Sequence, residues 1–133
     1  MVESVETPAS RGRILVADDE PHIRRILATL LEEASFEVDQ VATGTAALAH
    51  LEADTEYDLV LMDIMMPGAT GLDVLRGLRE LDHRGSLPVI ILTAKGQDAD
   101  REIALSLGAS DFVTKPFSPK KLIARIEEIL NVA

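Results

Sequence analysis

Short apolar runs alternate along the chain with longer segments in which apolar residues recur with a helical period. Three runs, at residues 14–17, 59–62 and 89–92, are four residues long and entirely apolar, and β-branched side chains are frequent in them. Runs of this kind are typical of strands that are buried on both faces of a parallel sheet. Weaker strand candidates lie at residues 37–41 and 110–114.

The segments that follow the predicted strands have the spacing of amphipathic helices. The predicted helices cover residues 23–34, 45–52, 71–81, 98–107 and 122–130. Gly108 is typical of a residue that stops a helix, and Ser118 before Pro119 is typical of a helix start. Five strand–helix pairs predict one three-layer α/β domain, with a doubly wound parallel sheet and right-handed crossovers.

The first twelve residues show no such period and contain Pro8, Ser10 and Gly12. We expect a flexible N-terminal tail over residues 1–12 and the folded domain over residues 13–130. The tail has neither the positively charged start nor the apolar core of a signal peptide. No apolar run approaches the roughly 20 residues that a membrane span needs.

Composition narrows the classes of partner. The 133 residues include 13 Lys and Arg against 23 Asp and Glu, which gives a formal net charge of −10. Such a charge argues against nucleic-acid contact by this chain alone and against an anionic membrane surface, and it favours cations and proteins with basic patches. The sequence has no cysteine, which excludes disulfides and thiolate metal sites and fits a cytoplasmic location.

Polar side chains stand where four of the predicted strands end. In an open parallel sheet, ligands bind outside the carboxyl ends of the strands. These positions hold Asp18, Asp19, Asp63, Thr93 and Lys115. Each residue alone has an ordinary structural explanation as a helix cap, a turn residue or a loop charge. Their convergence on one edge of the sheet indicates a functional site.

The chemistry of this set favours phosphoryl transfer. Three neighbouring carboxylates repel one another, and a hard divalent cation such as Mg²⁺ relieves the repulsion. Lys115 adds a further positive charge to the predicted site. The sequence contains neither of the glycine-rich phosphate-binding motifs. A carboxylate nucleophile that takes up a phosphoryl group therefore fits better than a nucleotide pocket.

At these residues the sequence resembles a known family. The matching motifs are Ala17-Asp18-Asp19-Glu20, Leu61-Met62-Asp63-Ile64-Met65-Met66-Pro67-Gly68, Leu92-Thr93-Ala94 and Phe112-Val113-Thr114-Lys115-Pro116-Phe117. Residues 13–130 resemble the CheY-like receiver domain of two-component response regulators, most closely the receivers of winged-helix regulators of the OmpR/PhoB type. The resemblance implies a flavodoxin-like (βα)5 fold with the strand order 2-1-3-4-5.

The resemblance also implies the role of each residue in the site. Asp63 is expected to accept a phosphoryl group from a sensor histidine kinase or a phosphotransfer protein. Asp18, Asp19, Asp63 and the backbone carbonyl of Met65 are expected to hold Mg²⁺. The chain would then act as a signalling switch in a phosphorelay, and not as an enzyme beyond assisting its own phosphorylation and dephosphorylation.

Further residues are implied to respond to the phosphoryl group. Thr93 and Lys115 are expected to contact it, and Thr93 and Phe112 to form the switch. The alternative for Phe112 is an ordinary core aromatic without a switching role. The Lys115–Pro116 peptide bond is expected to be cis.

The lifetime of the acyl phosphate is expected to depend on Met65 and Lys95, which flank the path of the attacking water in the resembled family. Because Met65 is apolar and cannot hydrogen-bond a water strongly, we expect slow hydrolysis.

A phosphorylation-dependent homodimer is a further expectation from the resemblance. Asp111 and Arg125 occupy positions that pair across a two-fold axis in related receivers. Arg101, however, would face Lys121, which is repulsive, so the pattern is incomplete. The alternative is that these charges form an ordinary solvated surface.

Three other functions compete with this interpretation. A haloacid-dehalogenase-like phosphatase would carry a second aspartate two residues after the nucleophile, where this chain has Met65. A flavodoxin-like electron carrier would need a phosphate loop where Asp18 and Asp19 stand. A degenerate receiver could act as a scaffold only. The sequence fits a stand-alone regulator and a receiver from a longer regulator equally well.

Overall fold

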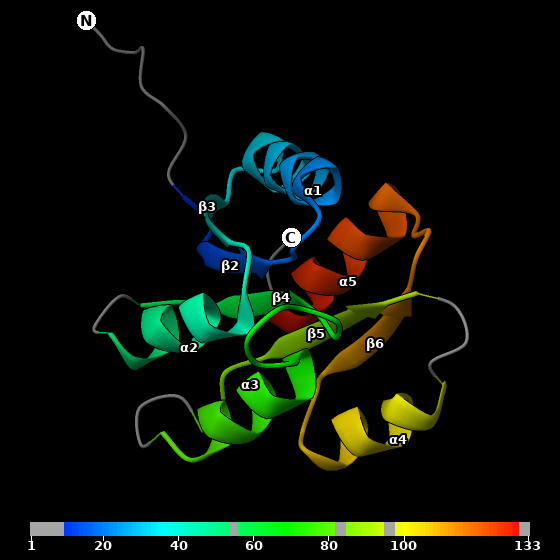
Figure 1. Cartoon of the computed structure of the whole chain (residues 1–133). Helices are drawn as coiled ribbons and strands as arrows, with labels where there is room; N and C mark the ends of the chain where they lie inside the picture. Colours follow the sequence, from blue (N-terminus) through cyan, green and yellow to red (C-terminus); the bar gives the residue numbers. More distant parts are fainter. Residues whose placement is uncertain (1–9, 54–55, 82–84, 95–97, 131–133) are drawn as a thin grey trace, which may run out of the picture.

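The computed structural model describes residues 10–53, 56–81, 85–94 and 98–130, with backbone alone at 98 and 99. Its five strands form one parallel sheet in the order β3-β2-β4-β5-β6, which confirms the predicted order 2-1-3-4-5 (Figure 1). The strands are β2 (Arg13–Ala17), β3 (Glu37–Val41), β4 (Leu59–Asp63), β5 (Val89–Thr93) and β6 (Asp111–Thr114).

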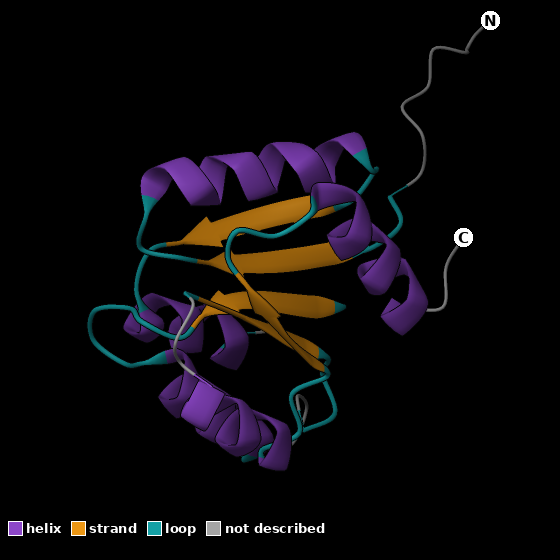
Figure 2. Cartoon of the chain, turned by 90° about the vertical axis from the view of Figure 1, so that its right-hand side faces the viewer, coloured by secondary structure: helices purple, strands orange, loops and turns teal. Residues whose placement is uncertain are grey.

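Five helices cover the two faces of the sheet (Figure 2). They are α1 (Pro21–Glu33), α2 (Gly44–Glu52), α3 (Gly71–Arg79), α4 (Asp98–Ser106) and α5 (Pro119–Leu130). Helices α1 and α5 pack on one face, and α2, α3 and α4 pack on the other. The three-layer architecture predicted from the apolar pattern is therefore confirmed.

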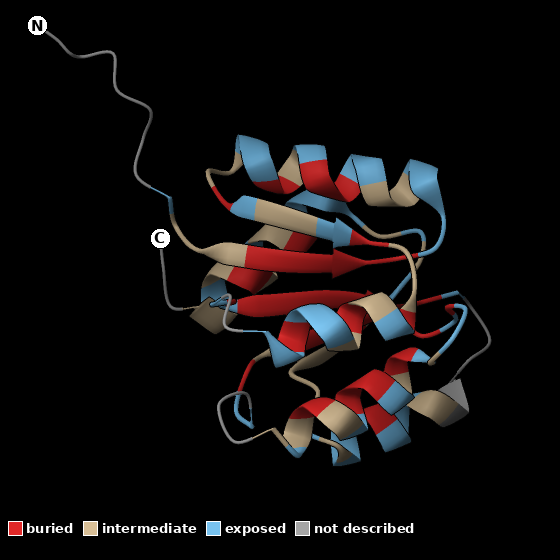
Figure 3. Ribbon diagram, turned by 60° about the vertical axis from the view of Figure 1, so that its left-hand side comes forward, coloured by how far each residue is buried: buried red, intermediate tan, exposed pale blue. Residues whose placement is uncertain are grey.

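Each central strand contributes to two separate apolar cores because alternate side chains point to opposite faces of the sheet. In β2, Ile14 and Val16 belong to the core beneath α1 and α5, whereas Leu15 and Ala17 belong to the other core. Every residue of β4 and β5 is buried, and these strands form the continuously buried centre of the molecule (Figure 3). Because these strands are buried on both faces, they appear in the sequence as unbroken apolar runs.

The helix boundaries follow local capping chemistry. Helix α4 is followed by Gly108 at φ +88°, and the Ser118 side chain accepts a hydrogen bond from the Lys121 N–H at the start of α5. Helix α1 is followed by Ser35 at φ +75°, a conformation that glycine adopts more easily. Helix α3 ends at Arg79, two residues before the predicted boundary.

The described part of the expected N-terminal tail contacts the domain. Arg11 donates hydrogen bonds to the Ala34 carbonyl and to Glu127, and its guanidinium lies 5.0 Å from the centre of the Phe36 ring. The Gly12 carbonyl accepts a hydrogen bond from the backbone N–H of the first residue of β3. Residues 1–9 of the expected tail lie outside the described part of the chain.

No helix within the described residues is long and apolar enough to cross a membrane.

Candidate functional site

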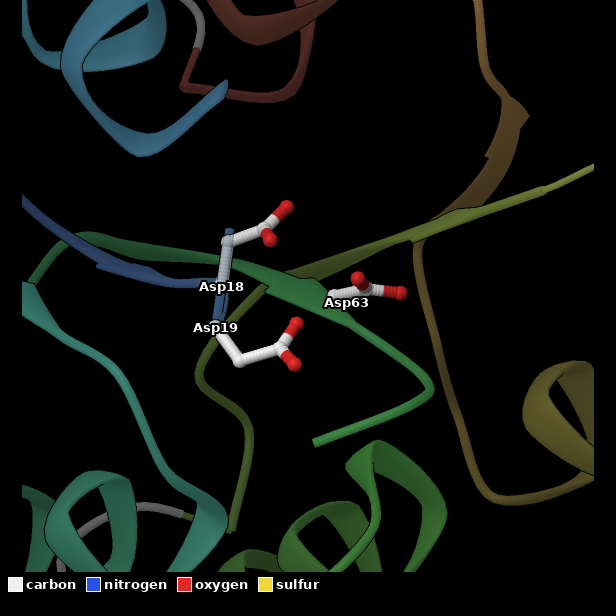
Figure 4. Close-up of side chains that lie close together, drawn as sticks. All are labelled: Asp18, Asp19 and Asp63. Carbon is white, nitrogen blue, oxygen red and sulfur yellow. The ribbon is translucent and has the colours of Figure 1, made fainter. Parts of the chain in front are cut away.

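Three carboxylates meet at the carboxyl edge of the sheet, as the sequence predicted (Figure 4). Asp18 and Asp19 follow β2, and Asp63 is the last residue of β4. One carboxylate oxygen from each residue lies within 4.8 Å of those from the other two. Asp18 is completely buried and Asp63 nearly so, whereas Asp19 is exposed. The cluster is therefore open to solvent on the side of Asp19.

Lys115 binds two of the three carboxylates. Its ammonium donates a hydrogen bond of 2.9 Å to Asp18 Oδ2 and one of 3.0 Å to Asp63 Oδ2. It reaches this position because it directly follows β6, whose last residue pairs in register with the last residue of β5. The ammonium thus neutralises part of the negative charge of two neighbouring carboxylates.

The burial and charges of the site shift the pKa values of Asp63 and Lys115. Burial raises the pKa of Asp63, and the nearby charge of Asp18 acts in the same direction, while the hydrogen bond from Lys115 partly opposes both. Burial alone would lower the pKa of Lys115, but its hydrogen bonds to Asp18 and Asp63 outweigh this effect and raise it. The ammonium therefore stays charged beside the carboxylates at neutral pH.

Backbone N–H groups hold the remaining oxygens of the two buried carboxylates. Asp18 Oδ1 accepts a hydrogen bond of 2.9 Å from the Glu20 N–H, and Asp63 Oδ1 accepts one of 3.2 Å from the Met65 N–H. Within the part of the chain that the structure describes, no hydrogen bond holds the Asp19 carboxylate. Asp19 is the carboxylate that is freest to adjust to a ligand.

The loop after Asp63 is clamped between the first residues of two helices. The Gly44 N–H at the start of α2 donates to the Pro67 carbonyl, and a Cβ at Gly44 would lie only 1.8 Å from the Ala69 carbonyl oxygen. A Cβ at Gly71, at the start of α3, would lie 2.5 Å from the Asp63 carbonyl oxygen. The two glycines let the helices approach close enough to fix the backbone that carries Asp63.

The two expected switch residues lie on neighbouring strands. Thr93 ends β5 and is 1% exposed, and its hydroxyl donates to the Ala94 carbonyl. Phe112 lies in β6 and is 6% exposed, as part of the core beneath α2, α3 and α4. The Arg101 guanidinium of α4 lies 5.9 Å from the centre of the Phe112 ring. The structure thus places Phe112 inside the domain, beneath Arg101.

The other expected site residues have different surroundings. The Lys115–Pro116 peptide bond is cis. The Met65 side chain is 58% exposed beside the carboxylate cluster. Lys95, expected to influence the lifetime of the acyl phosphate, lies outside the described residues.

The residues of the expected dimer surface form contacts within the chain. The side chain of Arg125 donates 2.8 Å to Asp111 Oδ2 and 2.7 Å to Glu128 Oε1. These bonds raise the pKa of Arg125, the one to Glu128 most strongly. Lys121 is exposed on the same face. An Asp111–Arg125 pair between two subunits would replace a pair that already exists within one subunit.

One residue that the sequence pattern did not reveal also contacts the site. Arg24, the fourth residue of α1, donates a hydrogen bond of 2.7 Å to the backbone carbonyl of Asp18. A cation near a helix N-terminus is electrostatically unfavourable. An arginine in the first turn of a predicted helix, five residues after Asp19, was therefore a signal in the sequence, but it did not identify the backbone carbonyl that Arg24 binds.

The donor set of the carboxylate cluster fits a hard divalent cation. Mg²⁺ prefers oxygen ligands, takes only one or two carboxylates in many sites and keeps several of its waters. The buried oxygens of Asp18 and Asp63 and the exposed carboxylate of Asp19 provide such ligands, with room for water on the open side. The cluster could therefore bind a metal ion.

Comparison with known proteins identifies the family. The sequence model of the response regulator receiver domain family matches residues 14–127, and the chain belongs to this family. It is 43% identical over 122 residues to the transcriptional regulatory protein ResD of Bacillus subtilis, covering 91% of this chain and 49% of ResD. It is 44% identical over 118 residues to the sensory transduction protein RegX3 of Mycobacterium tuberculosis, covering 89% of this chain and 50% of RegX3. The chain thus spans about half the length of these curated relatives.

Solved structures of receiver domains are also similar. The receiver domain of the sensor histidine kinase PA1611 from Pseudomonas aeruginosa, solved with a magnesium ion coordinated in its active site cleft, has a TM-score of 0.83 and 29% identity; the match covers 90% of this chain and 98% of that one. The chemotaxis response regulator CheY4 of Vibrio cholerae has a TM-score of 0.82 and 25% identity, with 92% and 99% of the two chains covered. The predicted CheY-like fold is confirmed.

Proposed function

We propose that this chain is a phosphorylation-dependent switch in which Asp63 accepts a phosphoryl group from a phosphohistidine of a sensor histidine kinase or phosphotransfer protein. The observation that supports it most directly is the Asp63 carboxylate, which lies within 3.0 Å of the Lys115 ammonium and in a cluster of carboxylates suited to a cation. Membership of the receiver family supports the same conclusion.

Asp63 is better placed than its neighbours to act as the nucleophile. Asp18 is completely buried, so an incoming phosphoryl donor cannot reach its carboxylate. The exposed carboxylate of Asp19 has no ammonium beside it in the described structure. Asp63 alone combines partial access, at 7% exposure, with the Lys115 charge.

The proposed transfer exchanges one bond to phosphorus for another. A carboxylate oxygen of Asp63 attacks the phosphorus atom as the P–N bond of the phosphohistidine breaks, and the bonding electrons leave with the imidazole nitrogen. Lys115 moves its hydrogen bond from the carboxylate to the incoming phosphoryl group. The Met65 N–H continues to bind the carboxyl group.

A divalent cation is part of the proposed site. Asp18, Asp19 and Asp63 would hold Mg²⁺ together with the Met65 backbone carbonyl. The metal would stabilise negative charge on the transferring phosphoryl oxygens. This chain's own contribution is to place three carboxylates within reach of one ion while Lys115 offsets their repulsion.

The proposed response to phosphorylation passes from Thr93 to Phe112. The Thr93 hydroxyl moves towards a phosphoryl oxygen, and Phe112 moves within the space between β6 and α4. The cost of this motion includes the loss of the Arg101 contact with the Phe112 ring, about 0.5–1 kcal/mol for a cation–π pair whose cation is exposed.

The alternative of a phosphatase gains no support. Ile64 directly after Asp63 is buried, and the next side chain is the apolar Met65. The described site therefore offers no second acid two residues after Asp63 to protonate a leaving alcohol. We propose that the chain is a switch and not an enzyme with an external substrate.

The output is proposed to lie outside this chain. ResD is a transcriptional regulatory protein, and this chain covers only about half of it. The net charge of −10 argues against DNA contact by the receiver itself. We propose that phosphorylation changes how the surface around α4, β6 and α5 contacts an output segment, a partner or a second copy of the chain.

Beryllofluoride, a stable mimic of the phosphoryl group, provides a direct test. Adding it with Mg²⁺ to the ¹⁵N-labelled protein should shift the backbone resonances of Thr93, Phe112 and Lys115, and Asp63→Asn should abolish these shifts. The matched control is Asp58→Asn, an exposed carboxylate just before the same strand. Equal shifts in Asp63→Asn and wild type would refute the assignment of Asp63.

A further inference from the structure

Arg24 connects α1 to the backbone of the carboxylate cluster. Its side chain donates a hydrogen bond of 2.7 Å to the carbonyl oxygen of Asp18. This carbonyl belongs to the planar peptide unit that joins Asp18 to Asp19. The guanidinium therefore holds the one rigid unit that lies between the two acidic residues.

Arg24 completes the hydrogen bonding of the Asp18 residue. The Asp18 N–H donates to the Val41 carbonyl, and its two carboxylate oxygens accept from Glu20 and Lys115. The carbonyl held by Arg24 is the fourth polar group of a completely buried residue. A buried carbonyl without a partner is unfavourable, so loss of Arg24 favours rotation of this peptide towards water.

The position of Asp19 depends on the same peptide unit. No hydrogen bond within the described structure holds the Asp19 carboxylate, yet one of its oxygens lies within 4.8 Å of those of Asp18 and Asp63. The side chain is aimed by its backbone, and that backbone is fixed on one side by the Asp18 carbonyl. Rotation of the peptide would carry Asp19 away from the other two carboxylates.

We infer that Arg24 is a positioning residue for the cation site, which it acts on by fixing the Asp18–Asp19 peptide and thereby aiming Asp19. This inference rests on the proposed function in that it deepens the description of the same site. Arg24 touches neither the cation nor the phosphoryl group in this account. Its effect is to keep three carboxylates arranged for one ion before the ion arrives.

The test compares Mg²⁺ affinity among variants of the full chain by titration of ¹⁵N-labelled protein. Arg24→Ala should weaken Mg²⁺ binding about tenfold, the lower end of the effect of residues that orient metal ligands. Arg24→Lys retains one donor and should recover part of the loss. The matched control is Arg25→Ala, which removes the same charge from an exposed position and should change affinity by less than about twofold because distant charges are screened.

A double-mutant cycle separates positioning from a general loss of structure. If Arg24 acts through Asp19, Arg24→Ala should have little further effect on Mg²⁺ affinity in an Asp19→Asn background. Urea unfolding of each variant reports whether the fold is kept, and Arg24→Lys provides a folded variant if Arg24→Ala unfolds.

Three results would overturn the inference. They are equal affinities in Arg24→Ala and Arg25→Ala, an undiminished effect of Arg24→Ala in the Asp19→Asn background, and no Mg²⁺ binding by the wild type. Labelling of wild-type Asp63 by acetyl phosphate tests the proposed function separately. A wild type that is phosphorylated, with an Arg24→Ala variant that binds Mg²⁺ normally, would leave the function intact and refute the role of Arg24.

Discussion

Arg79 forms hydrogen bonds with two loops, the one that precedes β5 and the one that follows α4. It is the last residue of α3, and its guanidinium donates hydrogen bonds to four backbone carbonyls. Two acceptors, Gly85 and Leu87, precede β5, and the other two, Leu107 and Gly108, follow α4. Burial lowers the pKa of this guanidinium, although it remains charged at any physiological pH.

The energetic value of Arg79 follows from the exposure of its acceptors. The bonds to Gly85 and Gly108 are exposed, so water can replace the guanidinium there. The bonds to Leu87 and Leu107 are partly buried, and each carbonyl would lose a charged donor. Counting only these two bonds, Arg79→Ala should lower the free energy of unfolding by about 2–3 kcal/mol.

Urea unfolding followed by circular dichroism measures this loss. With an m value of about 1.5–2 kcal/mol/M for a domain of this size, the midpoint should fall by more than about 1 M. The matched control is Arg76→Ala on the same helix, where an exposed ion pair with Asp73 at 3.6 Å is worth about 0–0.5 kcal/mol. Equal midpoints for the two variants would show that the carbonyl contacts of Arg79 contribute nothing to stability.

Three further predictions concern a strained turn, a helix cap and the lifetime of the phosphorylated state. Ser35→Gly should stabilise the fold by about 0.5–1 kcal/mol in urea unfolding, because a left-handed conformation costs an L-residue more than glycine loses in entropy; destabilisation would contradict this. The backbone and side-chain hydrogen bonds of Thr70 lower the pKa of Asp73, so its contribution is complete above pH 3.8 and is lost as the pH falls through the lowered value. The destabilisation by Asp73→Ala should therefore be constant near neutral pH and shrink in acid. A destabilisation that grows as the pH falls would contradict this prediction. Met65→Asn should shorten the lifetime of the acyl phosphate, measured by loss of label after removal of the donor, and a longer lifetime would argue against the water-orienting explanation.

The fold could be predicted from the sequence because its determinants are local and periodic. The runs beginning at Ile14, Leu59 and Val89 are strands buried on both faces, and this environment admits few polar residues. Helix ends were predicted where a cap has a definite chemistry, as at Gly108. The end of α3 was predicted two residues too late, because Leu81 continues the apolar period and packs against the core after the helix has ended.

The carboxylates of the site could also be predicted, because parallel strands bring their carboxyl ends to one edge. The arginines that support the fold and the site could not. Arg11, Arg24 and Arg79 all bind backbone carbonyls, and a backbone acceptor leaves no mark in the sequence that identifies it. Their partners become evident only once the chain is folded.

The expected dimer pair shows a different limit. The sequence indicated that Asp111 and Arg125 form an ion pair. It did not show that the pair forms within one chain. Arg125 of α5 also donates to the Ser110 carbonyl beside Asp111, so it lies against the start of β6 without a second subunit. Sedimentation with and without beryllofluoride would show whether a dimer forms.

In the proposed reaction, Asp63 accepts a phosphoryl group with the help of the cation site and Lys115. The most direct measurement is intact-mass and peptide mass spectrometry of the protein after incubation with acetyl phosphate and Mg²⁺. We expect one phosphoryl group on wild type, located on Asp63, and none on Asp63→Asn or on wild type in the presence of a chelator. A phosphoryl group on another residue, or undiminished labelling of Asp63→Asn, would show that Asp63 is not the acceptor.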